Sequence, residues 1–206
     1  NYAYEENIIE TLADARRFLK PNGVLIPQQI TQHVAPLVTP RFYRDLCVWD
    51  DVGAGLDFSL AKQMSINNLY VRTAEPDDLL DRGLTAKCWD RVDLRKKNGS
   101  IRRGQAQWVL DRDINIYGFA LWWECELLPG TTLSTSPLKP RSHWEQLYCP
   151  VSDPLIAQCG DTLSVNLTSD SRFEVGASVK WDVELRSKTS GTLIHQAMDM
   201  KRGDTP

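Results

Sequence analysis

The sequence predicts a mainly β protein: an antiparallel β-barrel or sandwich, preceded by one helix and interrupted early by a helical insertion. Two observations predict the sheets. Short apolar runs separated by turn residues fill almost all of the chain after residue 82, as in sandwiches and barrels. In one run every second residue is apolar and the residues between are charged, which is the period of a strand with one buried face. That run contains Val179, Trp181, Val183 and Leu185. A polar second face favours antiparallel pairing.

The first element is an amphipathic helix. Apolar residues recur at helical spacing between residues 8 and 19, with charged residues in the other positions. The turn Pro21-Asn22-Gly23 ends the helix. An extended segment then begins at Val24, and Pro27 indicates an edge or irregular position. We therefore assign residues 1–23 to a linker helix and residues 24–206 to the barrel.

The insertion occupies residues from about 40 to 82, where strand alternation is absent. Short helices are expected around residues 40–46 and 76–81, with the flexible glycines Gly53 and Gly55 between them. After the insertion the pattern predicts strands at 84–94, 101–111, 114–128, 146–151, 162–167, 177–185 and 192–200.

Composition excludes several classes of protein. The formal net charge of −3 argues against direct nucleic-acid binding, which normally requires a basic face. No apolar run approaches the roughly 18 residues of a membrane helix, so no membrane span is expected. The five cysteines are scattered and lack a Cys-x-x-Cys spacing, which indicates reduced thiols in an intracellular protein. We expect the cytoplasm, with the nucleus as the alternative in a eukaryote.

Common catalytic and cofactor motifs are absent. The glycines form neither a dinucleotide-binding nor a Walker pattern, and there is no G-x-S-x-G turn. The three histidines, His33, His143 and His195, are far apart and lack helical pair spacing with another ligand, so no metal site is expected.

Two groups remain as candidates for chemistry. Glu5 and Glu6 stand at the head of the first helix, and His143-Trp144 stands in a loop before a strand. Each has a structural interpretation. Acidic residues in a first turn complement the helix dipole, and an adjacent His and Trp often pack as a loop anchor. Taken singly, each group favours this structural interpretation.

Together, these groups belong to longer stretches that resemble protein arginine N-methyltransferases. Tyr4-Glu5, followed after a helix by Leu19-Lys20-Pro21-Asn22-Gly23, resembles the segment that joins the two domains of that family. Ser134-Thr135-Ser136-Pro137 and Ser142-His143-Trp144-x-Gln146 are similar to its STSP run and its Thr-His-Trp loop, with serine in place of the threonine. The similarity covers nearly the whole chain as the family's C-terminal β-barrel domain.

The resemblance implies a role for the insertion. In this family a helical arm, here Phe42 to about Asp57, reaches a neighbouring subunit and closes a head-to-tail homodimer. Leu46, Val48 and Trp49 are then the expected apolar contacts of the arm. A locally folded loop is the alternative.

The implied reaction is methyl transfer from S-adenosylmethionine to an arginine of a protein substrate. A guanidinium is a poor nucleophile because its lone pairs are delocalised and it stays protonated. A carboxylate held close can orient it and draw positive charge away from the attacking nitrogen. Glu5 matches the second of the family's two hairpin glutamates and Glu6 does not. The first glutamate would lie upstream of Asn1.

The resemblance also assigns the remaining site residues. His143 is implied as an electrostatic and proton-handling partner, and Trp144 as a wall of the arginine channel. Ser142 and Tyr4 are expected beside the substrate. The resemblance also implies a preceding cofactor-binding domain that is missing from this sequence, so we expect that this chain alone does not bind the cofactor. The start at Asn1 and not at methionine likewise indicates that an upstream segment has been removed. The alternative function is a non-catalytic paralogue that acts as a protein-binding scaffold.

Overall fold

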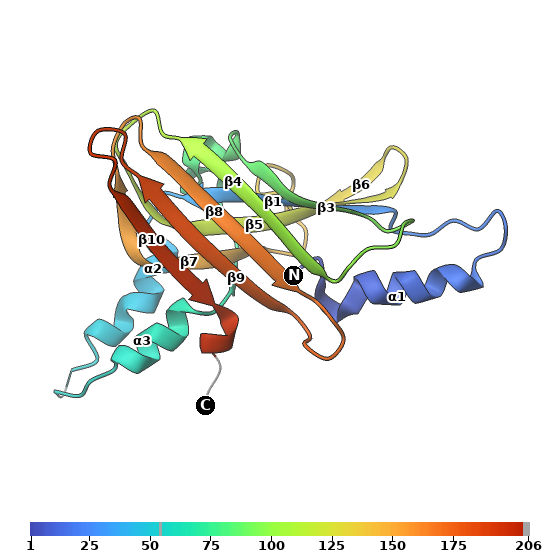
Figure 1. Cartoon of the computed structure of the whole chain (residues 1–206), viewed down its shortest axis with the longest axis horizontal. Coiled ribbons are helices and arrows are strands. Elements are labelled where there is room, and N and C mark those ends of the chain that lie inside the picture. Colours follow the sequence, from blue (N-terminus) through green and yellow to red (C-terminus); the bar gives the residue numbers. More distant parts are fainter. Residues whose placement is uncertain (54, 204–206) are drawn as a thin grey trace.

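Two antiparallel sheets packed face to face form the body of the molecule (Figure 1). The computed structural model describes residues 1–53 and 55–203. Sheet A has the strand order β2-β7-β5-β1-β3, with β6 paired to β5, and sheet B has the order β10-β9-β8-β4. Sheet A contains β1 (Gln29–Leu37), β2 (Tyr70–Arg72), β3 (Lys87–Asp93), β5 (Ile114–Leu128), β6 (Thr131–Ser134) and β7 (Gln146–Ala157). Sheet B contains β4 (Ile101–Val109), β8 (Thr162–Asp170), β9 (Ser178–Arg186) and β10 (Leu193–Asp199). The predicted mainly β antiparallel fold is confirmed.

The core lies between the two sheets, where the alternation of β9 turns its apolar side chains inward. Trp181 is fully buried there, and its indole Nε1 donates to the Pro150 carbonyl on β7 at 2.7 Å. β3 is the last strand of sheet A and β4 the last strand of sheet B, and these two edge strands come very close to each other. A Cβ on Gly104 would lie 1.7 Å from the Trp89 carbonyl oxygen, so only glycine fits. Both approaches link sheet A to sheet B.

Sequence reasoning missed strand β1, which lies between β5 and β3 in sheet A. The strand is covered on both faces, so it shows no alternation, and the buried Gln32 adds a polar residue to it. Pro27 and Pro36 also suggested irregular structure, although Ile26-Pro27 is a cis bond before the strand. Pro36 is tolerated because the pairing with β3 ends at Val34. All the strands predicted after residue 82 are present, and β5 has the predicted bounds.

The insertion is a helical hairpin that projects from the body (Figure 1). It comprises α2 (Arg41–Leu46), the 3-10 turn η3 (Cys47–Asp50) and α3 (Ser59–Ile66). The helix predicted around residues 40–46 is confirmed, whereas α3 was not predicted. After α3 the chain rejoins sheet A through β2, so the projecting part is shorter than 40–82. The expected helix at 76–81 is two 3-10 turns, η4 (Pro76–Asp78) and η5 (Leu80–Gly83). We call residues 41–66 the arm.

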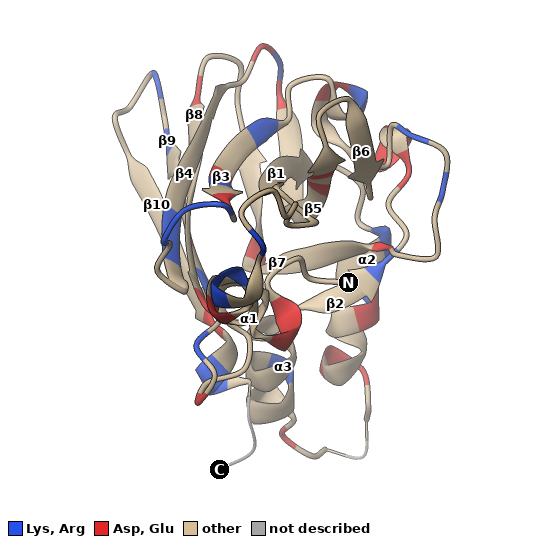
Figure 2. Cartoon of the chain, turned by 90° about the vertical axis from the view of Figure 1, so that its right-hand side faces the viewer, with Lys and Arg blue, Asp and Glu red and all other residues tan. Residues whose placement is uncertain are grey.

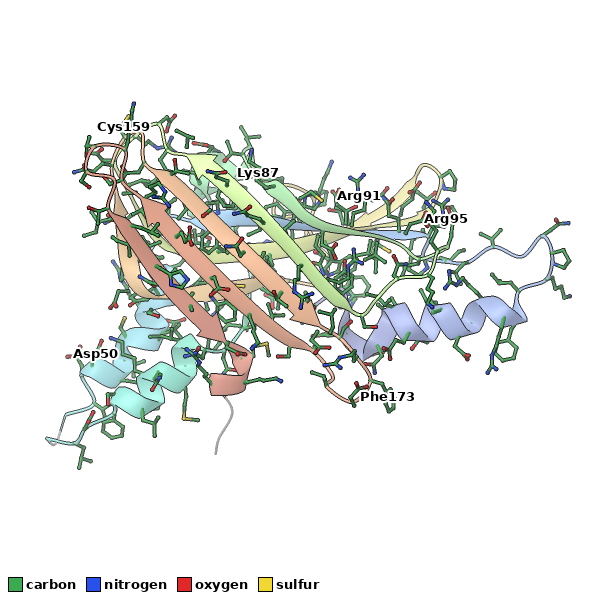
Figure 3. All side chains as sticks on the ribbon, viewed as in Figure 1. Asp50, Lys87, Arg91, Arg95, Cys159 and Phe173 are labelled. Carbon is green, nitrogen blue, oxygen red and sulfur yellow. The ribbon has the colours of Figure 1, made fainter. Side chains whose placement is uncertain are left out.

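The N-terminal segment docks against one end of the sheets, as Figure 2 shows with α1 viewed nearly end-on. It consists of η1 (Glu5–Asn7), α1 (Ile8–Ala15) and η2 (Arg16–Phe18). Glu10 fastens α1, because its carboxylate accepts from the Ser100 hydroxyl at 2.9 Å and the Phe173 amide at 3.2 Å. Phe173 and Arg95 mark the loops at this end in Figure 3. In the described part of the chain no helix combines the length and apolarity needed to cross a membrane.

Candidate functional site

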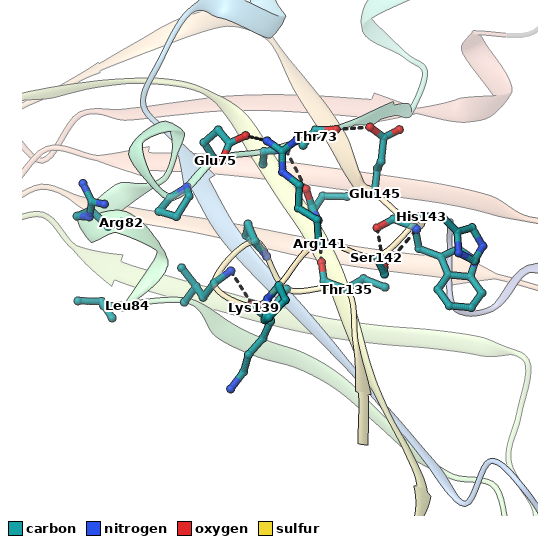
Figure 4. Close-up of a pocket in the computed structure, with 18 residues that line it drawn as sticks. Thr73, Glu75, Arg82, Leu84, Thr135, Lys139, Arg141, Ser142, His143 and Glu145 are labelled. Carbon is teal, nitrogen blue, oxygen red and sulfur yellow. Dashed lines mark hydrogen bonds and ion pairs between the residues drawn. The ribbon is translucent and has the colours of Figure 1, made fainter. Parts of the chain in front are cut away.

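A pocket of about 810 Å³ lies beside sheet A (Figure 4). Its walls are residues 73–76, Arg82 with Leu84, and the loop 135–146. Three of the predicted site residues line it: Ser142, His143 and Trp144. Sequence reasoning missed the wall at 73–76, because only the tertiary structure places that segment beside the loop 135–146.

The loop 135–146 is held in place at both ends. At its start the Thr135 amide donates to the Trp123 carbonyl at 3.0 Å. At its end the buried Gln146 side chain accepts from the Ala74 amide at 2.8 Å and donates to the Thr135 carbonyl at 2.7 Å. Gln146 therefore ties two walls of the pocket together. Gln146 belongs to the motif Ser142-His143-Trp144-x-Gln146, but the motif alone does not indicate this role.

Side chains also cross the pocket in Figure 4. The Arg141 guanidinium pairs with the Glu75 carboxylate, and the Thr73 hydroxyl donates to Glu145. Arg141 and Glu75 are both largely exposed, so their pair contributes little to stability. The ion pair does, however, join the loop 135–146 to the wall at 73–76 across the pocket.

The rings of His143 and Trp144 lie against each other at the pocket, tilted by 36° with centroids 4.0 Å apart. Trp144 also meets Trp123 edge to face at 5.8 Å. The Ser142 hydroxyl accepts from the Trp144 amide at 3.2 Å, so in this structure it shapes the loop. The result is an aromatic surface with an exposed imidazole at its edge.

Glu5 lies at the same end of the molecule, although it does not line the pocket. Asn1 connects the two parts. Its side-chain oxygen accepts from the Glu145 amide at 2.9 Å, its carbonyl accepts from Trp123 Nε1 at 2.9 Å, and Glu5 follows four residues further along the chain. The start of the chain, four residues before Glu5, therefore lies against the end of the loop that carries His143 and Trp144.

Tyr4 does not face the pocket, so the prediction that it contacts substrate is wrong. Its side chain is fully buried in the core, and its hydroxyl donates to Asp90 Oδ2 at 2.6 Å. Burial, reinforced by the adjacent Asp90 carboxylate, raises the pKa of Tyr4 well above its usual value. The hydroxyl therefore stays protonated as a donor. Consecutive side chains in this turn point in different directions, so Tyr4 points into the core and Glu5 points to the surface.

The arm presents different apolar residues from those predicted. Leu46 is only 5% exposed, because it shares one face of α2 with Phe42 and packs on sheet A. The half-buried Trp49 stacks on Phe58 and donates to the Ser65 hydroxyl at 2.9 Å, which holds the arm together. Of the three predicted contacts, only Val48 is well exposed, at 53%.

Other apolar residues do reach the surface of the arm. Leu56 and Leu60, in the second half of the hairpin, are 67% and 62% exposed. Val52 is also exposed. Sequence reasoning missed all three, because only the tertiary structure shows which apolar residues of the arm stay exposed.

Comparisons with known proteins agree with this architecture. The family model for the arginine methyltransferase oligomerization subdomain matches residues 28–188. Protein arginine N-methyltransferase 2 of Homo sapiens is 23% identical, over 88% of this chain and 46% of its own length. The histone-arginine methyltransferase CARMER of Anopheles gambiae is 24% identical, over 96% of this chain and 33% of its own length. The chain therefore spans less than half the length of these curated relatives.

Solved structures show the same fold at low identity. The arginine methyltransferase enzyme-prozyme heterotetrameric complex of Trypanosoma brucei with AdoHcy has a TM-score of 0.77 at 17% identity, covering 94% of this chain and 63% of that one. Protein arginine methyltransferase 10 of Arabidopsis thaliana has a TM-score of 0.69 at 16% identity, covering 95% and 66%. With most of its length matched by the family model, the chain belongs to the protein arginine N-methyltransferase family, as the C-terminal oligomerization subdomain.

Proposed function

We propose that this chain forms the substrate side and the subunit contact of an enzyme that methylates arginine in proteins, using S-adenosylmethionine. The observation that supports the proposal is the position of the chain segment just before Glu5, which lies against the pocket loop that carries His143 and Trp144. A cytoplasmic location fits the five free cysteines, since a reducing compartment keeps thiols unpaired.

The chemistry of these side chains suits a substrate guanidinium. The Trp144 ring offers a face against which a planar cation can lie. The Glu5 carboxylate can accept N–H bonds from the guanidinium and localise its positive charge away from the nitrogen that is methylated. His143, at the exposed edge of the aromatic pair, is placed to interact with charge that develops there.

The residues of this chain do not fit the cofactor. S-adenosylmethionine supplies the methyl group, but the sequence has no glycine-rich strand-to-helix turn to receive it. We therefore assign cofactor binding to the part of the parent protein that matches the rest of the longer relatives. This chain contributes the orientation of the arginine.

Glu5→Gln in the full-length parent tests the proposal. Glutamine keeps the size of the side chain and removes its charge, so we expect turnover to fall about 100-fold or more, as for the loss of one preorganised electrostatic group. Turnover is measured on an arginine-containing peptide, and circular dichroism checks the fold. Glu6→Gln is the matched control, since Glu6 is an exposed neighbour with no assigned role. Normal turnover in Glu5→Gln would defeat the assignment.

We also propose that the arm joins two copies of the parent protein, since its exposed leucines form an apolar surface on an oligomerization subdomain. Replacing Leu56 and Leu60 together with aspartate should weaken the homodimer at least about 100-fold, because each buried leucine contributes about 1.5–3 kcal/mol. Sedimentation velocity over a range of concentrations measures this. Val109→Asp, on the exposed side of β4, is the control. A dimer that persists unchanged in the double variant would place the contact elsewhere.

A further inference from the structure

The backbone that carries Glu5 has an unusual conformation. The two residues that follow it, Glu6 and Asn7, have φ of 55° and 54°, in the left-handed region that non-glycine residues seldom adopt. Two such residues in succession persist only where the surrounding structure holds them. Contacts made by the residues on either side hold this turn.

The strongest contact is made by Tyr4, the residue before Glu5. Its hydroxyl donates to Asp90 on β3, and the same carboxylate receives two bonds from Arg102 on β4, at 2.9 Å from Nε and 2.7 Å from Nη2. Hydrogen bonds to an ionised carboxylate are shorter and stronger than those between neutral groups. The Asp90 side chain is only 5% exposed, so solvent weakens these bonds little.

Tyr4 therefore fixes the backbone position at which the chain passes from the core to the exposed Glu5. On one side of Glu5 the backbone is tied to two strands of the body through Tyr4. On the other side α1 is tied through Glu10 to the loops at Ser100 and Phe173. The strained turn lies between these two attachments, and Glu5 is at its start.

We propose that Tyr4 is a positioning residue, whose hydrogen bond to the Asp90–Arg102 ion pair fixes the backbone that presents Glu5 to the arginine. The inference rests on the proposed function for the role of Glu5. It replaces the substrate contact that the sequence suggested for Tyr4. Tyr4 acts through its neighbour and does not touch the substrate.

Tyr2 is a matched control for Tyr4. Its ring is also buried and meets the Tyr4 ring edge to face at 5.7 Å. Within the described residues, however, its hydroxyl donates to no carboxylate. A role as core packing alone predicts similar effects for Tyr2→Phe and Tyr4→Phe, whereas positioning through Asp90 predicts an effect for Tyr4→Phe only.

The first measurement is amide hydrogen exchange in the full-length parent protein and does not depend on activity. The Glu5 amide donates to the Tyr2 carbonyl at 3.1 Å, and the Ile8 amide donates to the Glu5 carbonyl. Tyr4→Phe should speed exchange at these two amides about tenfold or more, the effect of about 1.4 kcal/mol on the local opening equilibrium. Exchange in the strands should stay unchanged, and Tyr2→Phe should match the parent. Unchanged exchange at both amides in Tyr4→Phe would overturn the inference.

The second measurement is a double-mutant cycle in the same protein. Tyr4→Phe should lower kcat about tenfold with little change in KM, and should not lower the residual rate of Glu5→Gln any further. An equal loss in both backgrounds would show that Tyr4 acts independently of Glu5 and would overturn the inference. Full turnover in Glu5→Gln would instead defeat the proposed function, and the exchange measurement would still decide whether Tyr4 holds the turn.

Discussion

Trp181→Ala is expected to lower the free energy of unfolding by about 3–5 kcal/mol, the usual cost of removing a large buried aromatic side chain. Trp181 lies on β9 between the two sheets and is fully buried. Its indole also links the sheets through the bond to the Pro150 carbonyl. The variant leaves a cavity in the centre of the core and removes the donor for that carbonyl.

Urea unfolding of this chain, followed by far-ultraviolet circular dichroism, measures the effect. Val109→Ala is the control, because Val109 is 72% exposed on β4 and its truncation should change stability by about 0.5 kcal/mol or less. A second variant, Trp181→Phe, keeps most of the ring volume and removes the N–H, so its loss should be smaller. If Trp181→Ala cost less than about 1 kcal/mol, the two sheets would not depend on this contact.

The same residue shows why much of the fold could be predicted from sequence. Strand β9 has one face in the core and one in solvent, so its alternation is visible in the residues themselves. Strand β1 has no such pattern, because the arm and the η4 and η5 turns cover its outer face and sheet B covers its inner face. A strand buried on both sides cannot be distinguished by period alone. Its identification needed the tertiary structure.

The candidate site divides in a similar way. His143 and Trp144 could be found because a short motif carries them, and the pocket does contain them. Tyr4 belongs to a motif as well, but its role depends on Asp90, a residue 86 positions away in the sequence. Nothing local in Tyr4-Glu5 shows which of the two side chains points inward. The prediction for Leu46 was wrong for the same reason. An apolar residue in the arm can face either a partner subunit or sheet A, and the local sequence does not show which.

Asp90→Ala is expected to lower the free energy of unfolding by about 3–5 kcal/mol, the range for breaking a buried ion pair by removing one partner. Alanine leaves the Arg102 guanidinium without the carboxylate that receives two of its bonds, and that guanidinium is only 22% exposed. It also leaves the buried Tyr4 hydroxyl without its acceptor. The cost therefore comes from groups that remain buried without partners, more than from the net energy of the pair itself.

This origin of the cost can be tested with a second variant. In Asp90→Leu combined with Arg102→Met, no charge is left unpaired, and replacing both members of a buried pair with apolar residues is often neutral or stabilising. The double variant should therefore unfold at a higher urea concentration than Asp90→Ala, although it lacks both charged groups. If the double variant were less stable than Asp90→Ala, the attraction within the pair would be the larger contribution. The attraction between Asp90 and Arg102 would then itself stabilise the part of the sheets that holds Tyr4.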